Sequence, residues 1–300
     1  MHVVIIGNGI AGINVASALS GAESVTVEVF TAENRQLYSR VRLPEVLSGT
    51  SEPDDILFHK PEWYEKKNIT VHTGATVTAI DPDGRTITLE EGTQVSWDYL
   101  VLATGASANH PSLPGANLAG VCTMRTMDDV ARIRSQCKEH PESASVIGGG
   151  LLGLEAARAL KGAGAQSVRV FEIAPRLLPR QLDETGATLL EKRFSAMGID
   201  VLCAVQTEEF LPAADDSSRA GAVKLKDSRV FPSDVTILSM GVHSNTELAK
   251  SAGLAVNRGI VVDNRMRTSN PAIYAVGDCA EFDGIVWVSF PQHSNRRRWR

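Results

Sequence analysis

The feature that most constrains the fold of this chain is a glycine-rich turn that occurs twice. Residues 2–6 form a short apolar run that ends at Gly7, and residues 10–19 have the pattern of a helix. Residues 143–147 repeat the apolar run, GGGLLG follows at residues 148–153, and a second helical stretch comes next. The two turns begin 141 positions apart (148 minus 7). The sequence therefore predicts two strand–turn–helix units.

Each copy is followed by a second matching element. The run DYLVLATG closes at Gly105 and the run DVTILSMG closes at Gly241, which is 98 and 93 positions after the first glycine of each copy (105 minus 7, 241 minus 148). Apolar runs of this kind are typical of buried parallel strands. We therefore expect an α/β protein with two doubly wound, Rossmann-like dinucleotide-binding domains. Residues 70–92 and 223–234 predict short antiparallel strands outside the main sheets.

Length and composition agree with this architecture. Three hundred residues exceed the usual size of one core, and residues 108–120, rich in proline, glycine and asparagine, predict a domain boundary near residue 108. The net charge is −5 and the dense basic run is confined to residues 296–300, which argues against nucleic-acid binding. Neither a signal peptide nor a transmembrane stretch is expected. Four cysteines without a C-x-x-C pair or metal-ligand spacing predict reduced thiols in a cytoplasmic protein and no metal site.

The first turn, GNGIAG, has the spacing of a dinucleotide-binding motif. Gly7 permits a sharp turn, Gly9 lets the backbone approach a pyrophosphate, and Gly12 lets the helix pack closely on the strand. The N–H groups at the start of the helix would face anionic oxygens, and they belong to Ile10 and Ala11. A turn of another kind, found here by chance, is the alternative.

The second turn repeats this spacing with Gly148, Gly150 and Gly153, and a carboxylate follows the next strand in both copies. Glu33 lies near the end of SVTVEVFTAE and suits a ribose hydroxyl. Glu172 closes SVRVFE, where a carboxylate accepts both ribose hydroxyls but repels a 2′-phosphate, so it favours NADH over NADPH. The alternative is that Glu172 is a solvated strand end.

The order of the motifs resembles a known family. GNGIAG, LVLATG, GGGLLGLE, LSMG and YAVGDCAE follow one another as in the FAD-dependent pyridine nucleotide-disulfide oxidoreductase superfamily, over residues 1 to about 284. The segments LYSRVRLPEVLSG, GGGLLGLEAARAL and EIAPRLLPRQLD are most similar to NADH:rubredoxin reductases and to the flavin module of NADH-dependent nitrite reductases.

This resemblance implies which site takes which cofactor. The first fingerprint would bind FAD and the second NADH, with an FAD-binding domain formed by residues 1–108 and 245–300 and an NAD-binding domain formed by residues 109–244. Asp278 would hydrogen-bond the FAD ribitol, Thr104 and Gly105 would lie along FAD, Val77 would meet the adenine, and Arg40 would contact phosphates. The implied FAD set is Gly7, Asn8, Gly9, Ile10, Ala11, Gly12, Glu33, Arg40, Val77, Ala103, Thr104, Gly105, Gly277 and Asp278. The implied NADH set is Gly148, Gly150, Leu151, Leu152, Gly153, Glu155, Glu172 and Gly241.

The chain also departs from the family pattern. The redox cysteine that precedes Leu-Pro in disulfide-reducing relatives is replaced by Arg42, and Cys279 is expected to be a packing residue, so thiol chemistry is not expected. Several relatives pair a lysine near the flavin with the glutamate at Glu155, but here Glu45 takes the lysine's place. Arg42 could substitute for it, or Glu155 could be only a helix residue, so we assign no catalytic side chain. After GDCAEFDG the tail no longer follows the relatives, and their C-terminal interface domain is expected to be absent.

These observations lead to three hypotheses. The leading one is an NADH-dependent flavoprotein that passes electrons to a redox protein such as rubredoxin or to the metal centre of a nitrite reductase partner. The second is an NADH oxidase or quinone-type reductase that reduces a small acceptor at the same flavin. The third is a nucleotide-binding fragment without catalytic activity.

Overall fold

The computed structural model describes residues 1–286, which form two compact units. The first unit contains Met1–Tyr38, Leu57–Ser107 and the chain from Val242 onward, and the second contains Ser39–Ile56 and Ala108–Gly241. Within the described part, no helix combines the length and apolar character needed to cross a membrane. The basic run at residues 296–300 and most of the tail on which the expected loss of a C-terminal domain depends lie outside the described residues.

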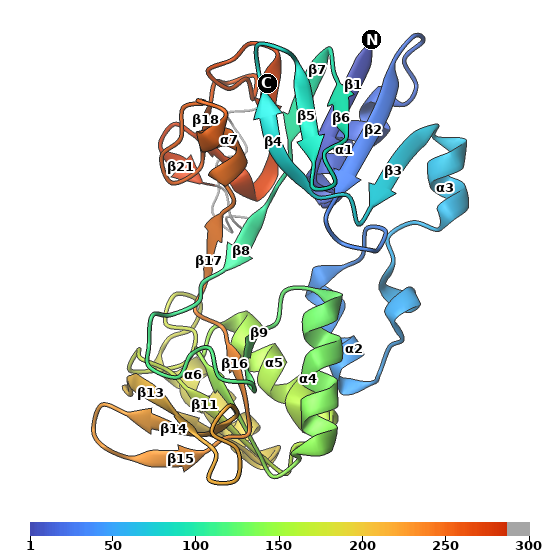
Figure 1. The fold of residues 1–300 in the computed structure, drawn as a ribbon. Helices are drawn as coiled ribbons and strands as arrows, with labels where there is room; N and C mark the ends of the chain where they lie inside the picture. The colour runs from blue at the N-terminus through green and yellow to red at the C-terminus, as the bar shows by residue number, and fades with distance from the viewer. Residues whose placement is uncertain (287–300) are drawn as a thin grey trace. The chain divides into compact units, whose positions relative to one another are not determined.

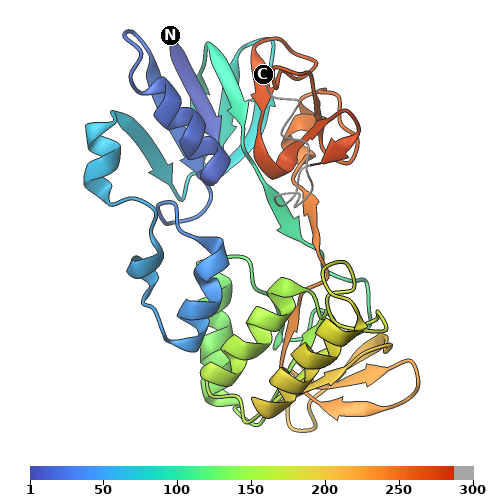
Figure 2. The ribbon, with the colours of Figure 1, turned by 180° about the vertical axis from the view of Figure 1, so that it is seen from behind.

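A five-stranded parallel sheet forms the centre of the first unit, in the order β19-β7-β1-β2-β3. Its strands are β1 (His2–Ile6), β2 (Thr26–Thr31), β3 (Ile69–Thr73), β7 (Tyr99–Leu102) and β19 (Ile273–Ala275). Apolar side chains of β1 enter two different core clusters, because successive side chains of a strand point to opposite faces. Helix α1 (Ile10–Leu19) lies on one of these faces, where Ile13 and Ala16 are buried (Figure 2).

The second unit has a parallel sheet of the same kind, in the order β12-β11-β10-β16-β9. Its strands are β9 (Val121–Thr123), β10 (Ser143–Ile147), β11 (Ser167–Phe171), β12 (Ile199–Leu202) and β16 (Val235–Leu238). Helix α5 (Leu151–Gly162) packs on this sheet, and α2 (Leu43–Ser48) and α4 (Met127–Glu139) pack with it on the same side (Figure 1). Helix α6 (Glu184–Ala196) packs on β12.

The two sheets have equivalent strand orders, which confirms the predicted α/β class with two Rossmann-like sheets. β1, β2, β3 and β7 correspond to β10, β11, β12 and β16. The fifth strands differ in origin, because β19 comes from late in the chain and β9 precedes its own glycine turn. The two fifth strands therefore hold the same place in their sheets but come from different parts of the chain.

Antiparallel strands lie outside both main sheets. The first unit has β4 (Val77–Asp81), β5 (Thr86–Leu89) and β6 (Gln94–Ser96), and the second has β13 (Thr207–Pro212), β14 (Ala220–Leu225) and β15 (Val230–Pro232). The prediction of antiparallel strands is thus confirmed except at residues 70–73. That segment belongs to β3, which pairs in parallel with β2. Its Ile69 packs in the same core cluster as Tyr64 of α3 (Pro61–Lys66). The local pattern does not reveal the pairing of β3 with β2, because β2 lies far earlier in the sequence.

Several short elements of the first unit lie late in the described chain. They are α7 (Glu247–Ser251), β18 (Ile260–Val262), the short 3₁₀ helix η3 (Gly277–Cys279), β20 (Ala280–Phe282) and β21 (Ile285–Val286). Glu281 is only 3% exposed, and its carboxylate accepts from the N–H of Gly259 at 2.8 Å and from the side-chain amide of Asn257 at 2.9 Å. Although burial opposes ionisation, these hydrogen bonds lower the pKa of Glu281. Two further short strands, β8 (Ala106–Ala108) and β17 (Val242–Ser244), pair as a ribbon.

Candidate dinucleotide sites

Both glycine turns lie at the carboxyl end of the central strand of their sheet. In the first unit, Gly7 follows β1, its N–H donates to the carbonyl of Phe30 in β2 at 2.8 Å, and the N–H of Ala103 donates to Ile6. The second unit repeats this pattern, because Gly148 donates to Phe171 at 2.8 Å. In an open α/β sheet, ligands bind outside the carboxyl ends of the strands where the strand order reverses. That place lies between β1 and β7 in one sheet and between β10 and β16 in the other.

The first and third glycines of each turn are required by the backbone itself. Gly7 and Gly148 have φ angles of 116° and 114°, which disfavour any side chain. A Cβ on Gly12 would lie 2.1 Å from the carbonyl oxygen of Gly7, and a Cβ on Gly153 would lie 2.0 Å from that of Gly148. The start of each helix is therefore held against the end of the preceding strand.

The middle glycines leave open space instead. Gly9 and Gly150 have extended backbones, and a Cβ built on either would meet no atom of the chain within 4 Å. The apolar side chains that follow them are exposed: Ile10 by 57%, Leu151 by 62% and Leu152 by 53%. A ligand can therefore approach the backbone at these two points without displacing protein atoms.

Unsatisfied hydrogen-bonding groups also gather at these turns. The N-cap residues of α1 and α5 are Gly9 and Gly150, and within the described residues neither helix has a side-chain cap. In contrast, Thr126 caps α4 and Asp183 caps α6. Uncapped N–H groups at a helix start favour an anion such as a pyrophosphate. In the first turn, the buried Oδ1 of Asn8 has no hydrogen-bond partner within residues 1–286. These features fit a bound dinucleotide at each turn.

The two carboxylates beside the turns are held differently. The carboxylate of Glu172 accepts from the N–H of Gly149 at 2.5 Å and from the N–H of Ala174 at 2.7 Å, so it lies against the second turn. Glu33 lies two residues beyond the end of β2, and it accepts a short hydrogen bond from the hydroxyl of Tyr38, a buried residue that the sequence analysis missed. A tyrosine five positions after a predicted ribose-binding carboxylate is the only sequence signal for this pair.

The Gly-Asp-Cys-Ala segment lies next to the first turn. η3 packs on α1, and a Cβ on Gly277 would come within 2.8 Å of the Cβ of Ala11. Asp278 therefore stands beside the first glycine turn, and the hydroxyl of Ser244 donates to its carbonyl at 2.6 Å. Cys279 is fully buried, its thiol donates to the carbonyls of Leu102 and Val276, and burial raises its pKa. It packs in the core, as expected.

The structure gathers most of the expected residues into two sets. At the first turn lie Gly7, Asn8, Gly9, Ile10, Ala11, Gly12, Glu33, Ala103, Thr104, Gly105, Gly277 and Asp278. At the second lie Gly148, Gly150, Leu151, Leu152, Gly153, Glu172 and Gly241. The side chain of Val77 is buried in the core, so it is not among the residues gathered at the first turn. Arg40 belongs to the second unit, where its guanidinium donates to the carbonyl of Arg125 at 2.6 Å.

The charged residues that depart from the family pattern pair with each other. The guanidinium of Arg42 donates to both carboxylate oxygens of Glu45, with contacts between 2.8 and 3.1 Å, and to the carbonyl of Asp55 at 2.7 Å. The hydrogen bonds from Arg42 and from Ser51 lower the pKa of Glu45. Glu155 in α5 is half-buried, and burial raises its pKa while Arg158 opposes the shift. Arg42 thus has its own carboxylate partner on α2.

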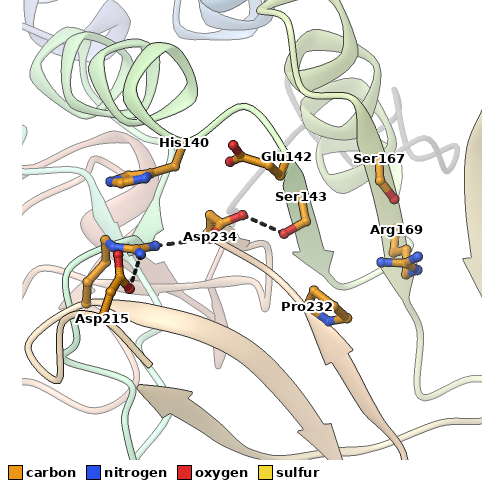
Figure 3. A pocket seen from close by; sticks show the side chains of 9 residues that line it. His140, Glu142, Ser143, Ser167, Arg169, Asp215, Pro232 and Asp234 are labelled. Carbon is orange, nitrogen blue, oxygen red and sulfur yellow. Dashed lines mark hydrogen bonds and ion pairs between the residues drawn. The ribbon is translucent and has the colours of Figure 1, made fainter. Parts of the chain in front are cut away.

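One surface pocket of the second unit lies away from the glycine turn. It has a volume of about 490 Å³ and is lined by residues at the amino ends of the strands, among them Ser143, Ser167 and Asp234 (Figure 3). Its polar groups already pair with each other: Asp234 accepts from Ser143 at 2.6 Å and from Arg219 at 3.0 Å. This end of the sheet is opposite to the one where such folds bind nucleotides.

Comparisons with known proteins agree with this geometry. The family model described as pyridine nucleotide-disulphide oxidoreductase matches residues 1–297. The chain is 38% identical over 288 residues to the nitrite reductase [NAD(P)H] of Bacillus subtilis. This match covers 95% of the present chain and 35% of the nitrite reductase. The chain is also 34% identical over 283 residues to the NADH-rubredoxin oxidoreductase of Clostridium acetobutylicum. That match covers 94% of the present chain and 69% of the oxidoreductase.

Solved structures give the same result. A covalent putidaredoxin reductase–putidaredoxin complex matches with a TM-score of 0.84 at 31% identity, covering 94% of this chain and 68% of the matched chain. The chain thus spans about a third of the length of its nitrite reductase relative and about two thirds of the others. With a family model that matches nearly every residue and with both glycine turns in place, the chain belongs to the pyridine nucleotide-disulphide oxidoreductase family.

Proposed function

We propose that the chain is an NADH-dependent flavoprotein oxidoreductase, with FAD at the first turn and NADH at the second. It would pass electrons to a redox-protein acceptor, such as rubredoxin, or to a metal centre of the nitrite reductase type. The proposed FAD-binding domain comprises residues 1–108 and 245–300, and the proposed NAD-binding domain comprises residues 109–244. The compact units differ from these bounds mainly at Ser39–Ile56, which belongs to the second unit. Four unpaired cysteines, three of them buried, are compatible with a cytoplasmic location.

One observation gives the strongest support to placing FAD at the first turn and NADH at the second. The two turns have the same geometry, but only the first has a further carboxylate delivered by the fifth strand, because Asp278 follows β19 and its segment packs on α1. FAD has a ribitol chain between its pyrophosphate and its reactive ring. The ribitol hydroxyls can hydrogen-bond a carboxylate in this position. The second site ends at Gly241, and its expected carboxylates are Glu172, which lies against the turn, and Glu155 on α5, neither of which follows a fifth strand. This difference suits FAD at the first site and NADH at the second.

The residues of the chain act by binding and alignment. The N–H groups at the starts of α1 and α5 would hold the two pyrophosphates, and Glu33 and Glu172 would each hold a ribose. Hydride acceptance and the later release of electrons would be supplied by FAD when it is bound. Hydride transfer needs mainly the alignment of two rings, so the lack of an assigned acid–base residue is no obstacle.

The cysteines support an acceptor other than a disulfide. Burial raises the pKa of Cys122 to about 12 and that of Cys137 to about 11, and burial together with Glu191 raises that of Cys203 to about 11. Thiols with such pKa values are protonated at neutral pH and react poorly. The fourth, Cys279, is fully buried. A one-electron redox protein or metal centre therefore suits the chain better than a dithiol substrate.

The proposal is tested by anaerobic reduction. The purified chain should retain FAD, and addition of NADH should bleach the visible flavin absorbance, after which oxidised rubredoxin should restore it. Steady-state turnover with rubredoxin, with oxygen and with a quinone separates a redox-protein acceptor from a small one. A protein that binds FAD but is not bleached by NADH would contradict the proposal, and so would one without flavin.

The preference for NADH can be tested at Glu172. Glu172→Ala should raise the KM for NADH by about tenfold, because a charge-assisted hydrogen bond to the ribose is lost, and should narrow the discrimination against NADPH. Steady-state kinetics with both nucleotides measures this. Glu142→Ala is the matched control, because it removes an exposed carboxylate at the opposite end of the same sheet. Unchanged kinetics in Glu172→Ala would remove this residue from the site.

The different roles of the second and third glycines can be separated. Gly150→Ala should leave the melting temperature nearly unchanged, because the added Cβ meets no protein atom, but should weaken NAD⁺ binding by about tenfold by filling the space of the pyrophosphate. Gly153→Ala should lower the free energy of unfolding by about 1–3 kcal/mol, because its Cβ clashes with the Gly148 carbonyl. Thermal melts and NAD⁺ titrations measure both effects. Unchanged NAD⁺ binding in Gly150→Ala would show that the open space at Gly150 has no role in binding, and a stability loss equal to that of Gly153→Ala would show that the space is not open.

A further inference from the structure

Two asparagines hold the strand ends that face the two proposed sites. In the first unit, the side-chain amide of Asn245 donates to the carbonyl of Thr104 at 2.8 Å, and its backbone N–H donates to Gly105 at 3.0 Å. In the second unit, the amide of Asn109 donates to the carbonyl of Met240 at 3.1 Å, and its N–H donates to Gly241 at 2.9 Å. Thr104 and Met240 each directly precede the glycine that follows a sheet strand. The same two hydrogen bonds therefore occur in both units.

The arrangement has a sequence basis that the glycine turns do not include. Each strand-closing glycine is followed four positions later by an asparagine: Gly105 by Asn109, and Gly241 by Asn245. The strands that follow the two glycines, β8 and β17, pair with each other, with residue 105 opposite 245 and residue 109 opposite 241. Each asparagine therefore holds the glycine of the other segment. We call the two pairs of bonds the asparagine clamps.

The clamps fix the direction of peptide groups at the proposed cofactor sites. The C=O and N–H of a planar trans peptide point in opposite directions. Anchoring the carbonyl of Thr104 therefore sets the direction of the N–H of Gly105, whose φ of 68° favours glycine. In the second unit, the clamp on Met240 does the same for Gly241, whose φ is 82°.

The first clamp is itself held in a single orientation. The hydroxyl of Ser107 donates to Oδ1 of Asn245 at 2.7 Å, so the amide cannot exchange its two ends without losing two bonds. The hydroxyl of Thr104 donates back to the carbonyl of Asn245 at 2.8 Å. A side chain that is held in this way is better suited to a positioning role than to the role of a solvated turn residue.

We propose that the clamps are positioning devices for the two cofactors: Asn245 sets the strand end along FAD, and Asn109 sets the strand end along NADH. This inference rests on the proposed function, because it assigns the clamps to the same two sites. Neither asparagine is proposed to react. Each acts through the peptide group that it holds, and each should affect the cofactor of its own unit.

The test is a crossed comparison of Asn245→Ala and Asn109→Ala in the full chain. Alanine removes the side-chain bonds, which for Asn245 include the acceptor of Ser107, and keeps the backbone N–H that pairs the ribbon. Asn245→Ala should raise the dissociation constant for FAD by about tenfold and shift the visible spectrum of the bound flavin, while NAD⁺ binding to the FAD-loaded protein changes less than about twofold. Asn109→Ala should show the reverse. Flavin fluorescence quenching and NAD⁺ titration calorimetry measure the two constants.

Milder variants keep the test decisive if an alanine variant does not fold. Asn245→Asp retains the acceptor for Ser107 but cannot donate to Thr104, so it should reproduce the FAD defect, whereas Ser107→Ala should have a smaller effect in the same direction. Lower melting temperatures with both constants and the flavin spectrum unchanged would overturn the inference, as would equal effects of both asparagines on both ligands. A wild-type chain that binds neither FAD nor NAD⁺ would instead overturn the proposed function.

Discussion

The close approach of each helix start to a strand-end carbonyl is the contact on which both sites depend. A hydrogen atom at Gly12 and at Gly153 is the only substituent that fits within about 2 Å of the carbonyls of Gly7 and Gly148. With the helix held there, its first N–H groups meet the end of the sheet, and the middle glycine leaves free space in front of them. A helix displaced by one side chain would neither pack on the strand nor present its N–H groups at the point where the strand order reverses.

The two units show how one arrangement can acquire different tasks. Their sheets share four corresponding strands, and the two glycine turns have the same spacing and nearly the same φ angle at their first glycine. The differences lie around the turns: Glu172 binds directly to its own turn, whereas Glu33 pairs with Tyr38. The fifth strand of the first sheet also brings Asp278 beside α1. The two units therefore differ in the residues that surround a common glycine turn, in agreement with the general separation of fold from function.

Much of this could be predicted because the decisive signals are local. The ranges expected for β1, α1 and β10 agree with the structure, since a strand, a glycine turn and a helix are encoded within some twenty residues. The parallel pairing of β3 was not predictable from its sequence, because its partner β2 lies about forty positions earlier. The pairing of Arg42 with Glu45, the bond from Tyr38 to Glu33 and the asparagine clamps were missed for another reason. Each depends on which of several polar neighbours a side chain selects after the chain has folded.

The central claim is that one chain holds two different dinucleotides in two equivalent cradles. Binding stoichiometry tests it most directly: the FAD-saturated chain is titrated with NAD⁺ while released flavin is monitored by its fluorescence. The account predicts one FAD and one NAD⁺ per chain, with no flavin released at saturating NAD⁺. Displacement of FAD by NAD⁺, or saturation with a single nucleotide per chain, would contradict it.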